Sequence, residues 1–309
     1  MSVSGVVTPP PAVSVLMPVY NTERYVGEAV RAVLQQTFRD FEFIIIDDGS
    51  ADGSTAILRR FSEEDGRIRL VSRPNTGYVT ALNEALGLAR APLVARMDAD
   101  DVALPNWLEV LVAFMQAHPE VVTAGVQVNH IDPDGEFLGR SDMPLAHEAI
   151  ETEHLKGELR IFHPGVCFRT EAARHVGGYR PEVCPCEDYD LWLRLGEVGR
   201  LQNVPEVLLA KRSVLSSVVA TTSLSRAHVI ETNIRRVLGE AWSRRGRGGE
   251  PPPVRVSCED TAMRLRQWAW WALGAGNVRT ARKHAWNAFR EAPGSVESWR
   301  VVFCALRGR

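Results

Sequence analysis

The stretch Pro92-Leu-Val-Ala-Arg-Met-Asp-Ala-Asp-Asp-Val102 decides how this chain is interpreted. Its apolar start predicts a buried strand, and three carboxylates, Asp98, Asp100 and Asp101, follow directly. Carboxylates at the end of a buried strand are costly unless a cation meets them. A divalent metal ion that shares oxygen ligands with a substrate diphosphate is a common reason for this pattern. The stretch therefore predicts a metal and phosphate site.

A second acidic cluster has the same relation to an apolar run. Asp47-Asp-Gly-Ser50 follows Phe41-Glu-Phe-Ile-Ile-Ile46. Acidic residues also cap helices and form turns, so each cluster alone has a purely structural explanation. Two such clusters, after two strands of one α/β pattern, favour a single site at the carboxyl ends of those strands.

Apolar residues alternate between strand spacing and helix spacing over the first third of the chain. The near-continuous β-branched runs are typical of strands buried on both faces, as in a parallel sheet. The pattern predicts an α/β fold with a mainly parallel, Rossmann-like sheet that is flanked by helices. The expected strands are 13–17, 41–46, 68–71 and 93–97, and the expected helices between them are 23–36, 54–61 and 80–89.

The pattern continues less regularly beyond residue 105. The turn Asp132-Pro-Asp-Gly135 predicts a hairpin between a strand at 121–131 and a return strand near Phe137. Further elements are a helix from about 105 to 117, a short strand at 166–168, and helices at 171–176 and 188–196.

Composition predicts three parts in the chain. Residues 1–12 are expected to form a flexible lead, 13–215 the main α/β domain, and 216–309 a C-terminal helical region. Residues 244–253 are rich in Gly, Pro and charge, which predicts a linker. Two helices at about 258–292, around Gly274-Ala-Gly-Asn277, resemble a single tetratricopeptide-like unit. Since only one copy is present, we expect this unit to pack on the main domain.

Charge and cysteine usage narrow the class of protein. The net charge of −2 over 309 residues gives no reason to expect nucleic acid as a partner. The five cysteines have no zinc-like spacing, so a reducing cytosol is the default compartment. No apolar run reaches the roughly 18 residues that a transmembrane helix needs. We therefore expect a cytoplasmic protein, and the composition predicts no oligomeric state.

The tryptophan-rich tail raises a second possibility, peripheral contact with the inner membrane. Trp268, Trp271 and Leu265 share one helical face, and nearby arginines could bind anionic headgroups. Ordinary packing against the catalytic domain explains the same pattern. The arginines concerned are Arg264, Arg266 and Arg279.

Seven short motifs occur in a fixed order between residue 13 and about residue 210. Each is weak alone, but the ordered set resembles the family 2 glycosyltransferases of the GT-A fold. The resemblance covers about two thirds of the chain and implies inverting transfer of a sugar from a nucleoside diphosphate donor. The motifs are Val15-Leu-Met-Pro-Val-Tyr-Asn21, Gln36-Thr-Phe38, Asp47-Asp-Gly-Ser50, Asn75-Thr-Gly77, Asp98-Ala-Asp-Asp101, His163-Pro164 and Glu187-Asp-Tyr-Asp-Leu-Trp192.

The resemblance implies a donor site built from the first strand ends. Pro18, Tyr20 and Asn21 end the first strand, where Tyr20 is expected to stack on the nucleotide base. Asp48 is expected to accept a hydrogen bond from the base. In a purely structural reading, Tyr20 is an interfacial aromatic residue and Asp48 a turn residue.

Asn75-Thr-Gly77 is expected to lie near the ribose and diphosphate, since Gly77 permits close approach of the backbone. An N-cap turn explains this segment equally well.

The resemblance also assigns the metal site and the base. Asp98 meets the ribose or a metal-bound water, and Asp100 binds Mn²⁺ or Mg²⁺ directly. Asp101 either replaces one of these two aspartates in its role or caps the next helix. Asp188 matches the catalytic base, and the N-terminus of its helix would stabilise the ionised carboxylate. His163, which precedes a proline, is expected to be a packed loop residue.

The chain departs from the family at one position. Many relatives carry a histidine after the last common strand, where this chain has Val214. Lys211 and Arg212 are expected to hold the diphosphate as fixed cations instead. The departure makes strict metal dependence an open question.

We therefore predict an inverting glycosyltransferase that moves a sugar from a nucleoside diphosphate donor to a hydroxyl of a saccharide or lipid-linked saccharide. A UDP-sugar is the first candidate donor. The expected setting is bacterial polysaccharide or glycolipid synthesis. One alternative is a catalytically weak scaffold that binds nucleotide sugars, motivated by Val214 and the appended helices. The other is a sugar-phosphate nucleotidylyltransferase, although the first loop lacks the glycine-rich, basic phosphate loop of such enzymes.

Overall fold

The computed structural model describes residues 9–215, 224–256 and 259–308. Most of the expected N-terminal lead, and the expected boundary at 215/216, therefore lie at or outside the limits of the described residues. Among the described residues, no helix combines the length and the hydropathy needed to cross a bilayer.

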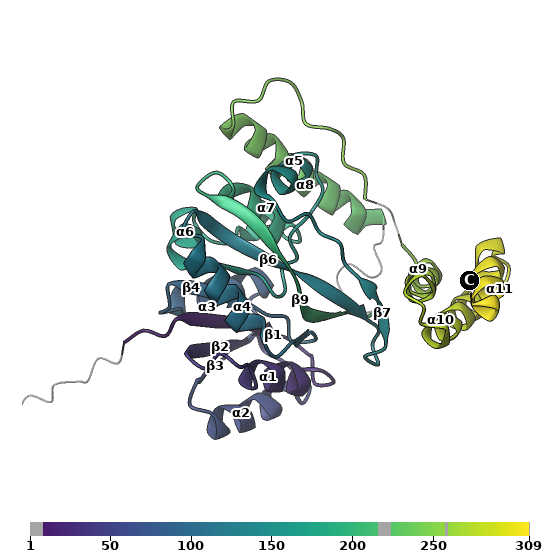
Figure 1. Ribbon diagram of the computed structural model, residues 1–309, viewed down its shortest axis with the longest axis horizontal. Coiled ribbons are helices and arrows are strands. Elements are labelled where there is room, and N and C mark those ends of the chain that lie inside the picture. Colours follow the sequence, from purple (N-terminus) through teal and green to yellow (C-terminus); the bar gives the residue numbers. More distant parts are fainter. Residues whose placement is uncertain (1–8, 216–223, 257–258, 309) are drawn as a thin grey trace, which may run out of the picture.

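A nine-stranded sheet forms the centre of the molecule (Figure 1). Its order is β3-β2-β1-β4-β8-β6-β9-β5, and β7 pairs with β6 outside this path. The strands are β1 (Val13–Val19), β2 (Phe41–Asp47), β3 (Ile68–Ser72), β4 (Leu93–Arg96), β5 (Val102–Ala103), β6 (Val121–Ile131), β7 (Phe137–Arg140), β8 (Cys167–Arg169) and β9 (Arg200–Arg212).

The sheet has a parallel half and a mixed half. Strands β1 to β4 pair in parallel, as expected from their β-branched runs. The short strand β8 then runs antiparallel between β4 and β6, while β6 and β9 are parallel to each other. Strand β8 has only three residues, and the sequence pattern did not predict its direction.

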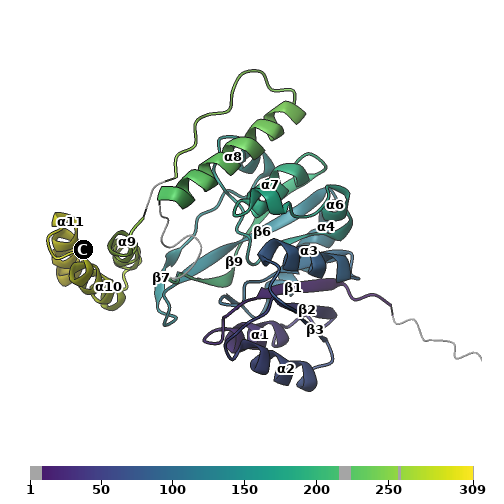
Figure 2. The same ribbon diagram turned by 180° about the vertical axis from the view of Figure 1, so that it is seen from behind.

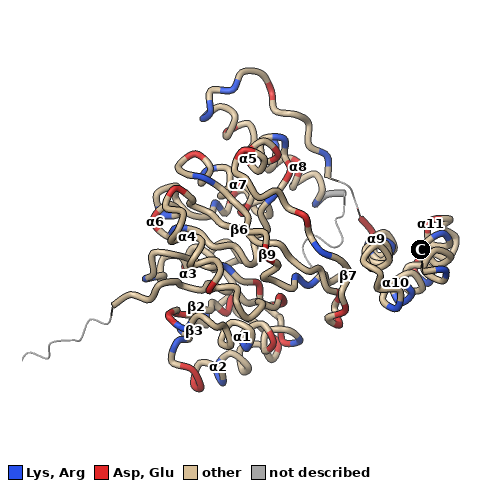
Figure 3. Tube along the Cα trace, in the orientation of Figure 1, with Lys and Arg blue, Asp and Glu red and all other residues tan. Residues whose placement is uncertain are grey.

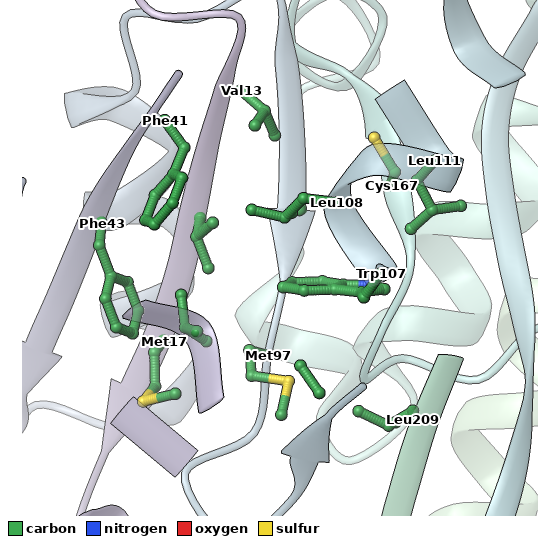
Figure 4. Close-up of a cluster of buried hydrophobic side chains, with 14 of the residues drawn as sticks. Val13, Met17, Phe41, Phe43, Met97, Trp107, Leu108, Leu111, Cys167 and Leu209 are labelled. Atoms are coloured by element: carbon green, nitrogen blue, oxygen red, sulfur yellow. The ribbon is translucent and has the colours of Figure 1, made fainter. Parts of the chain in front are cut away.

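Helices cover both faces because the strand side chains alternate. Val15 and Met17 face α1 (Val26–Leu34), α2 (Ser54–Glu64) and α4 (Trp107–Ala117), whereas Leu16 faces the opposite layer. Figure 4 shows part of the first core around Trp107. The opposite layer consists of α3 (Tyr78–Leu88), α5 (His147–His154), α6 (Thr170–His175) and α7 (Glu187–Leu195). A single 3₁₀ turn, Pro181–Val183, precedes α7.

The C-terminal helices attach at two places. Helix α8 (Leu224–Arg244) packs on α7 through Val237 and Ala241. Helices α9 (Thr261–Gly274), α10 (Val278–Glu291) and α11 (Val296–Arg307) form a three-helix unit beside β7, as Figures 1 and 2 show from opposite sides. The two expected tail helices are present and pack on the main sheet. The third helix, α11, was not predicted.

Polar contacts fasten the three-helix unit to the β6–β7 turn. The carboxylate of Asp132 accepts hydrogen bonds from His284 Nε2 at 2.8 Å and from Lys283 Nζ at 2.6 Å. Asn277 Nδ2 donates to the carbonyl of Phe137 at 2.9 Å. Below these contacts, Leu138 of β7 is fully buried in the tail core.

Candidate active site

The strand order brings the two acidic clusters to one edge of the sheet. Strand β1 pairs with both β2 and β4, so their carboxyl ends are neighbours. Asp48 follows β2 directly, and Asp98 lies two residues after β4. Ligand oxygens of Asp98, Asp100 and Asp101 all lie within 4.8 Å of one another. The site expected from the sequence is therefore assembled, as far as its acidic clusters are concerned.

Burial dominates the electrostatics of two of the three clustered aspartates, Asp100 and Asp101. Burial raises the pKa of Asp100 to about 6, and the neighbouring charge of Asp98 acts in the same direction. Burial raises the pKa of Asp101 well above its usual range, although Lys211 opposes the shift. Asp101 Oδ2 is buried without a hydrogen-bond partner among the described residues. Crowded carboxylates with an unpaired buried oxygen suit a hard divalent cation, which favours the ionised forms.

Arg96 lies beneath this cluster and is fully buried. Its guanidinium pairs with Asp98 at 2.5 Å and donates to the hydroxyl of Tyr78. The charge of Asp98 helps to keep the pKa of Arg96 above its usual range despite the opposing effect of burial. Nε and Nη1 of Arg96 have no partner within the described residues. A buried cation thus has unused donors next to the aspartate cluster.

A chain of hydrogen bonds runs from Arg96 into the opposite layer. The hydroxyl of Tyr78 accepts from Arg96 and lies 3.3 Å from Nδ1 of His163. Burial lowers the pKa of His163 well below its usual range, so the ring is neutral. Its Nε2 is hydrogen-bonded to the hydroxyl of Tyr179 at 2.9 Å. His163 is therefore a packed residue, as expected, and orients two tyrosines.

The N-terminus of α7 presents Glu187 and Asp188 to the same region. Burial raises the pKa of Glu187 to about 7, and the charge of Asp188 adds to the shift. Burial also raises the pKa of Asp188, while the N–H of Tyr189 at 2.7 Å and the charge of Arg96 lower it. Asp98 acts on the pKa of Asp188 as well. The charges of Asp98 and Arg96 therefore both influence the carboxylate at the start of α7.

Asp48 holds the loop at 75–77 in place. Its two carboxylate oxygens accept from the backbone N–H groups of Thr76 at 2.9 Å and Gly77 at 3.0 Å. Arg73 also pairs with Asp48, and both side chains are largely buried. Gly77 has φ +102°, a backbone conformation that glycine adopts without strain. Asp48, which was expected to bind the base, therefore holds the 75–77 loop, which was expected to lie near the ribose and diphosphate.

Residues at the end of β1 differ in accessibility. Tyr20 is 52% exposed, so its ring is free to stack on a ligand, whereas Pro18 is buried within the strand. Asn21 adopts φ +51° and accepts a hydrogen bond from the N–H of Ala51 at 2.8 Å. It therefore fastens the first loop to the segment after β2. Asn75 is exposed.

Arg212 contacts the back of the aspartate cluster. The backbone N–H of Arg212 donates to Asp101 Oδ1 at 2.6 Å. Nε of its side chain donates to the carbonyl of Asp100 at 2.9 Å. The rest of the guanidinium pairs with Glu28 at 2.7 Å and reaches the carbonyl of Asp132 at 3.4 Å. Since Arg212 is 5% exposed and its donors are occupied, the expectation that it holds a diphosphate is wrong.

Lys211, in contrast, lowers the pKa of Asp100 and Asp101 by its charge and stays half-buried. Val214 is half-buried and offers no ligand atom.

The three-helix unit reaches this side of the sheet through one aromatic contact. The ring of Trp271 on α9 lies 5.1 Å from the ring of His130 on β6, centroid to centroid. The ring of Phe162, next to His163, lies 5.8 Å from His130 on another side. Burial, and to a lesser extent the charge of Lys211, lowers the pKa of His130 to about 4. The tail therefore borders the region of Lys211.

Sequence reasoning gave no role to four polar residues at this edge, namely Arg73, Tyr78, Arg96 and Glu187, although Glu187 opens one of the seven motifs. Arg96 had a visible signal, because a lone arginine in an otherwise apolar strand needs an acidic partner. Arg73 and Tyr78 flank a motif that was recognised, but nothing in their spacing indicated which carboxylate or ring they would meet.

Comparisons with known proteins show the family to which the chain belongs. Residues 14–177 match the model of the family Glycosyl transferase family 2. An uncharacterized glycosyltransferase of Haemophilus influenzae is 31% identical over 65% of this chain, and the chain spans less than two thirds of its length, 65%. The amylovoran biosynthesis glycosyltransferase AmsE of Erwinia amylovora is 32% identical over 65% of this chain and 76% of its own.

Two solved structures share the fold at low identity. TarS of S. aureus, solved as residues 1–349 with UDP-GlcNAc, aligns at TM-score 0.59 and 16% identity over 96% of this chain and 92% of its own. The mannosyltransferase PcManGT of Pyrobaculum calidifontis, solved with GDP-Man and Mn²⁺, aligns at TM-score 0.54 and 20% identity over 97% and 81%. With its matching family model and its ordered strand-end aspartates, the chain belongs to glycosyl transferase family 2.

Proposed function

We propose that this protein is an inverting glycosyltransferase that moves a sugar from a nucleoside diphosphate donor to an acceptor hydroxyl. One observation carries the proposal: Asp98 of the aspartate cluster pairs with the buried Arg96, and the charges of both residues act on the pKa of Asp188. A transferase of this kind needs a cation site for the diphosphate and a carboxylate base close to it. The roles of individual residues below are part of the proposal.

Asp188 is proposed as the base. As the acceptor oxygen attacks the anomeric carbon, Asp188 takes the hydroxyl proton. The bond from the anomeric carbon to the diphosphate then breaks, and the diphosphate leaves with the bonding electrons. A raised pKa makes the ionised carboxylate a stronger proton acceptor than an exposed aspartate. The N–H of Tyr189 keeps the carboxylate oriented at 2.7 Å.

Asp98 and Asp100 are the proposed ligands of a divalent cation, Mn²⁺ or Mg²⁺. When bound, the cation would neutralise charge on the departing diphosphate. Asp101 is committed through Oδ1 to Arg212, so only its buried Oδ2 remains free to support the site. Lys211 supplies a further positive charge near these carboxylates, in place of the histidine expected at Val214.

The donor site is proposed along the ends of β1 and β2. Pro18 and Asn21 shape the first loop, and the exposed Tyr20 ring is available for the base. Asp48 Oδ1 accepts from both Arg73 and the N–H of Thr76, so the lone pair that could still accept from a base N–H is on Oδ2. Asn75 and Gly77 then border the ribose and diphosphate. A UDP-sugar is the first candidate donor.

A saccharide or lipid-linked saccharide is the proposed acceptor, in bacterial polysaccharide or glycolipid synthesis. The support is the similarity to AmsE, which is named for amylovoran biosynthesis, and to WbnJ of Escherichia coli, which is named for O-antigen biosynthesis and is 34% identical over 65% of this chain.

The decisive experiment compares Asp188→Asn with the wild type. Asparagine keeps the size of the side chain but accepts no proton, so we expect transfer to fall about a thousandfold. Binding of UDP with Mn²⁺, followed by thermal shift, should be unchanged. Asp65→Asn is the matched control, because Asp65 pairs with Arg67 far from this edge. If Asp188→Asn turned over at the wild-type rate, the assigned role would be rejected.

A nucleotide panel tests the donor and the metal separately. We expect one of UDP, GDP, dTDP or CMP to raise the melting temperature with Mn²⁺ or Mg²⁺, and EDTA to abolish the rise. A rise that survives EDTA would contradict the metal assignment. Binding without transfer to any of a broad set of acceptors would favour a nucleotide-sugar-binding scaffold.

A further inference from the structure

The surface expected to meet lipid is buried in this structure. Trp268 is 1% exposed and Leu265 is 5% exposed, and both belong to the core of the three-helix unit. Trp271 is half-buried against His130. These residues therefore hold the tail together and cannot reach a membrane.

A different face of the same unit exposes large apolar side chains. On α11 the exposed residues other than Glu297 of the first turn recur every three or four positions and are apolar or basic: Val296, Trp299, Arg300, Phe303, Leu306 and Arg307. The exposed fractions are 58% for Trp299, 53% for Phe303 and 64% for Leu306. A helix of a soluble protein normally places polar residues on this side. The exposed side of α11 is therefore suited to a partner that is both apolar and anionic.

Helix α10 extends the same chemistry. Its exposed positions are Arg279, Arg282, Trp286, Arg290 and Glu291, and Trp286 is 55% exposed. Arg282 donates to the carbonyl of Leu306 at 2.9 Å, so the exposed sides of α10 and α11 adjoin. Figure 3 marks the basic residues along these two helices. Each helix has one acidic residue, Glu291 or Glu297, close to its end.

We define the aromatic–arginine face by its exposed side chains on these two helices. Its arginines lie against rings: the guanidinium of Arg307 is 4.1 Å from the ring centroid of Phe303, and that of Arg300 is 5.9 Å from Trp270. Trp270 on α9 is itself 38% exposed. The face consists of Arg279, Trp286, Arg290, Val296, Trp299, Arg300, Phe303, Leu306 and Arg307.

We propose that the aromatic–arginine face docks on the surface of an anionic lipid bilayer. Tryptophan and phenylalanine enter the boundary between headgroups and acyl chains, and arginines between them bind phosphate groups. A second copy of the chain is a poorer occupant. A twofold interface would set this face against itself and bring arginines of like charge together. The proposal concerns binding only, so it stands or falls independently of the transfer reaction.

Flotation of the intact protein with vesicles tests the proposal, without donor or acceptor. We expect it to float with vesicles of phosphatidylcholine and phosphatidylglycerol, to remain behind with phosphatidylcholine alone, and to bind less at high salt. The variant Arg290→Gln/Arg300→Gln/Arg307→Gln should bind about a hundredfold more weakly, at about fivefold for each arginine. The variant Trp286→Ser/Trp299→Ser/Phe303→Ser should lose flotation.

Matched controls alter equally exposed residues elsewhere. Leu145→Ser/Val198→Ser/Val229→Ser removes apolar side chains that are 44%, 44% and 47% exposed, and should leave flotation unchanged. Arg59→Gln/Arg60→Gln/Arg69→Gln removes three exposed arginines near β3 and should do the same. Melting temperatures show that each variant is folded.

Three outcomes would overturn the proposal. They are absence of flotation with anionic vesicles, equal binding of wild type and face variants, and a wild-type dimer in sedimentation that the face variants dissociate.

Discussion

The sheet edge and the three-helix unit depart from the ordinary distribution of residues in opposite ways. At the sheet edge, charged groups are buried: Arg96 is fully covered, and Oδ2 of Asp101 has no hydrogen-bond partner among the described residues. In the three-helix unit, aromatic rings such as Trp286 and Phe303 are exposed. Both arrangements cost free energy in the isolated protein. A buried, underpaired charge indicates a small ionic ligand, whereas an exposed aromatic face indicates an extended apolar one.

Removing the buried cation should have the largest effect on stability. Arg96→Met leaves Asp98 and the Tyr78 hydroxyl without their donor, and we expect a loss of about 3–5 kcal/mol in unfolding free energy. Urea denaturation at neutral pH measures it. Arg60→Met is the control, since Arg60 is 68% exposed and pairs with Glu64 on the surface, and it should cost less than about 1 kcal/mol. Equal losses for both would contradict the role given to Arg96.

The tryptophans of the tail allow the comparison to be made within one unit. Trp268→Ala should destabilise the protein by about 3 kcal/mol, because it leaves a cavity between α9, α10 and α11. Trp286→Ala removes a ring that is 55% exposed and should change stability by less than about 0.5 kcal/mol. Thermal and urea unfolding of the two variants, side by side, test this. A large loss for Trp286→Ala would mean that the exposed face serves folding.

The smallest expected effect concerns Glu187 and depends on pH. Its pKa in the folded protein, about 7, exceeds the ordinary value of 4.5. The protonated form therefore favours folding: its contribution is complete below about pH 4.5 and is lost as the pH rises through about 7. Glu187→Gln removes this loss, so the variant should gain on the order of 1 kcal/mol over wild type at pH 8 and little at pH 5.

Urea unfolding at the two pH values distinguishes this from a general effect of the substitution. A stability difference that does not change with pH would show that Glu187 is not protonated preferentially in the folded state.

The sequence predicted the elements in which local pattern and environment agree. The β-branched runs of β1 and β2 and the amphipathic spacing of α1, α3 and α10 correspond closely to the observed bounds. Helix α11 was not predicted, although its buried residues Ser298, Val301 and Ala305 recur at helical spacing. The aspartate cluster was predicted from the three carboxylates that follow the apolar run at 92–95.

The partners of the charged residues were not predictable. The contacts that Arg212 makes depend on β9 lying beside β6, and these two strands are about 70 residues apart in the chain. Likewise, the contact of Arg96 with Tyr78 joins two separate elements, β4 and α3, through side chains alone.

Asp132 and Arg212 give the two regions a common support. Arg212 contacts Asp100, Asp101 and the carbonyl of Asp132, while the Asp132 carboxylate accepts from His284 of α10. The chain from the aspartates to the tail therefore contains only two intermediate residues. By thermodynamic linkage, any free energy that a ligand at the aspartates transmits along this chain to the tail is returned in equal amount when the tail binds. Occupancy at one end would then report on occupancy at the other, and neither affinity would be a fixed property of its own surface.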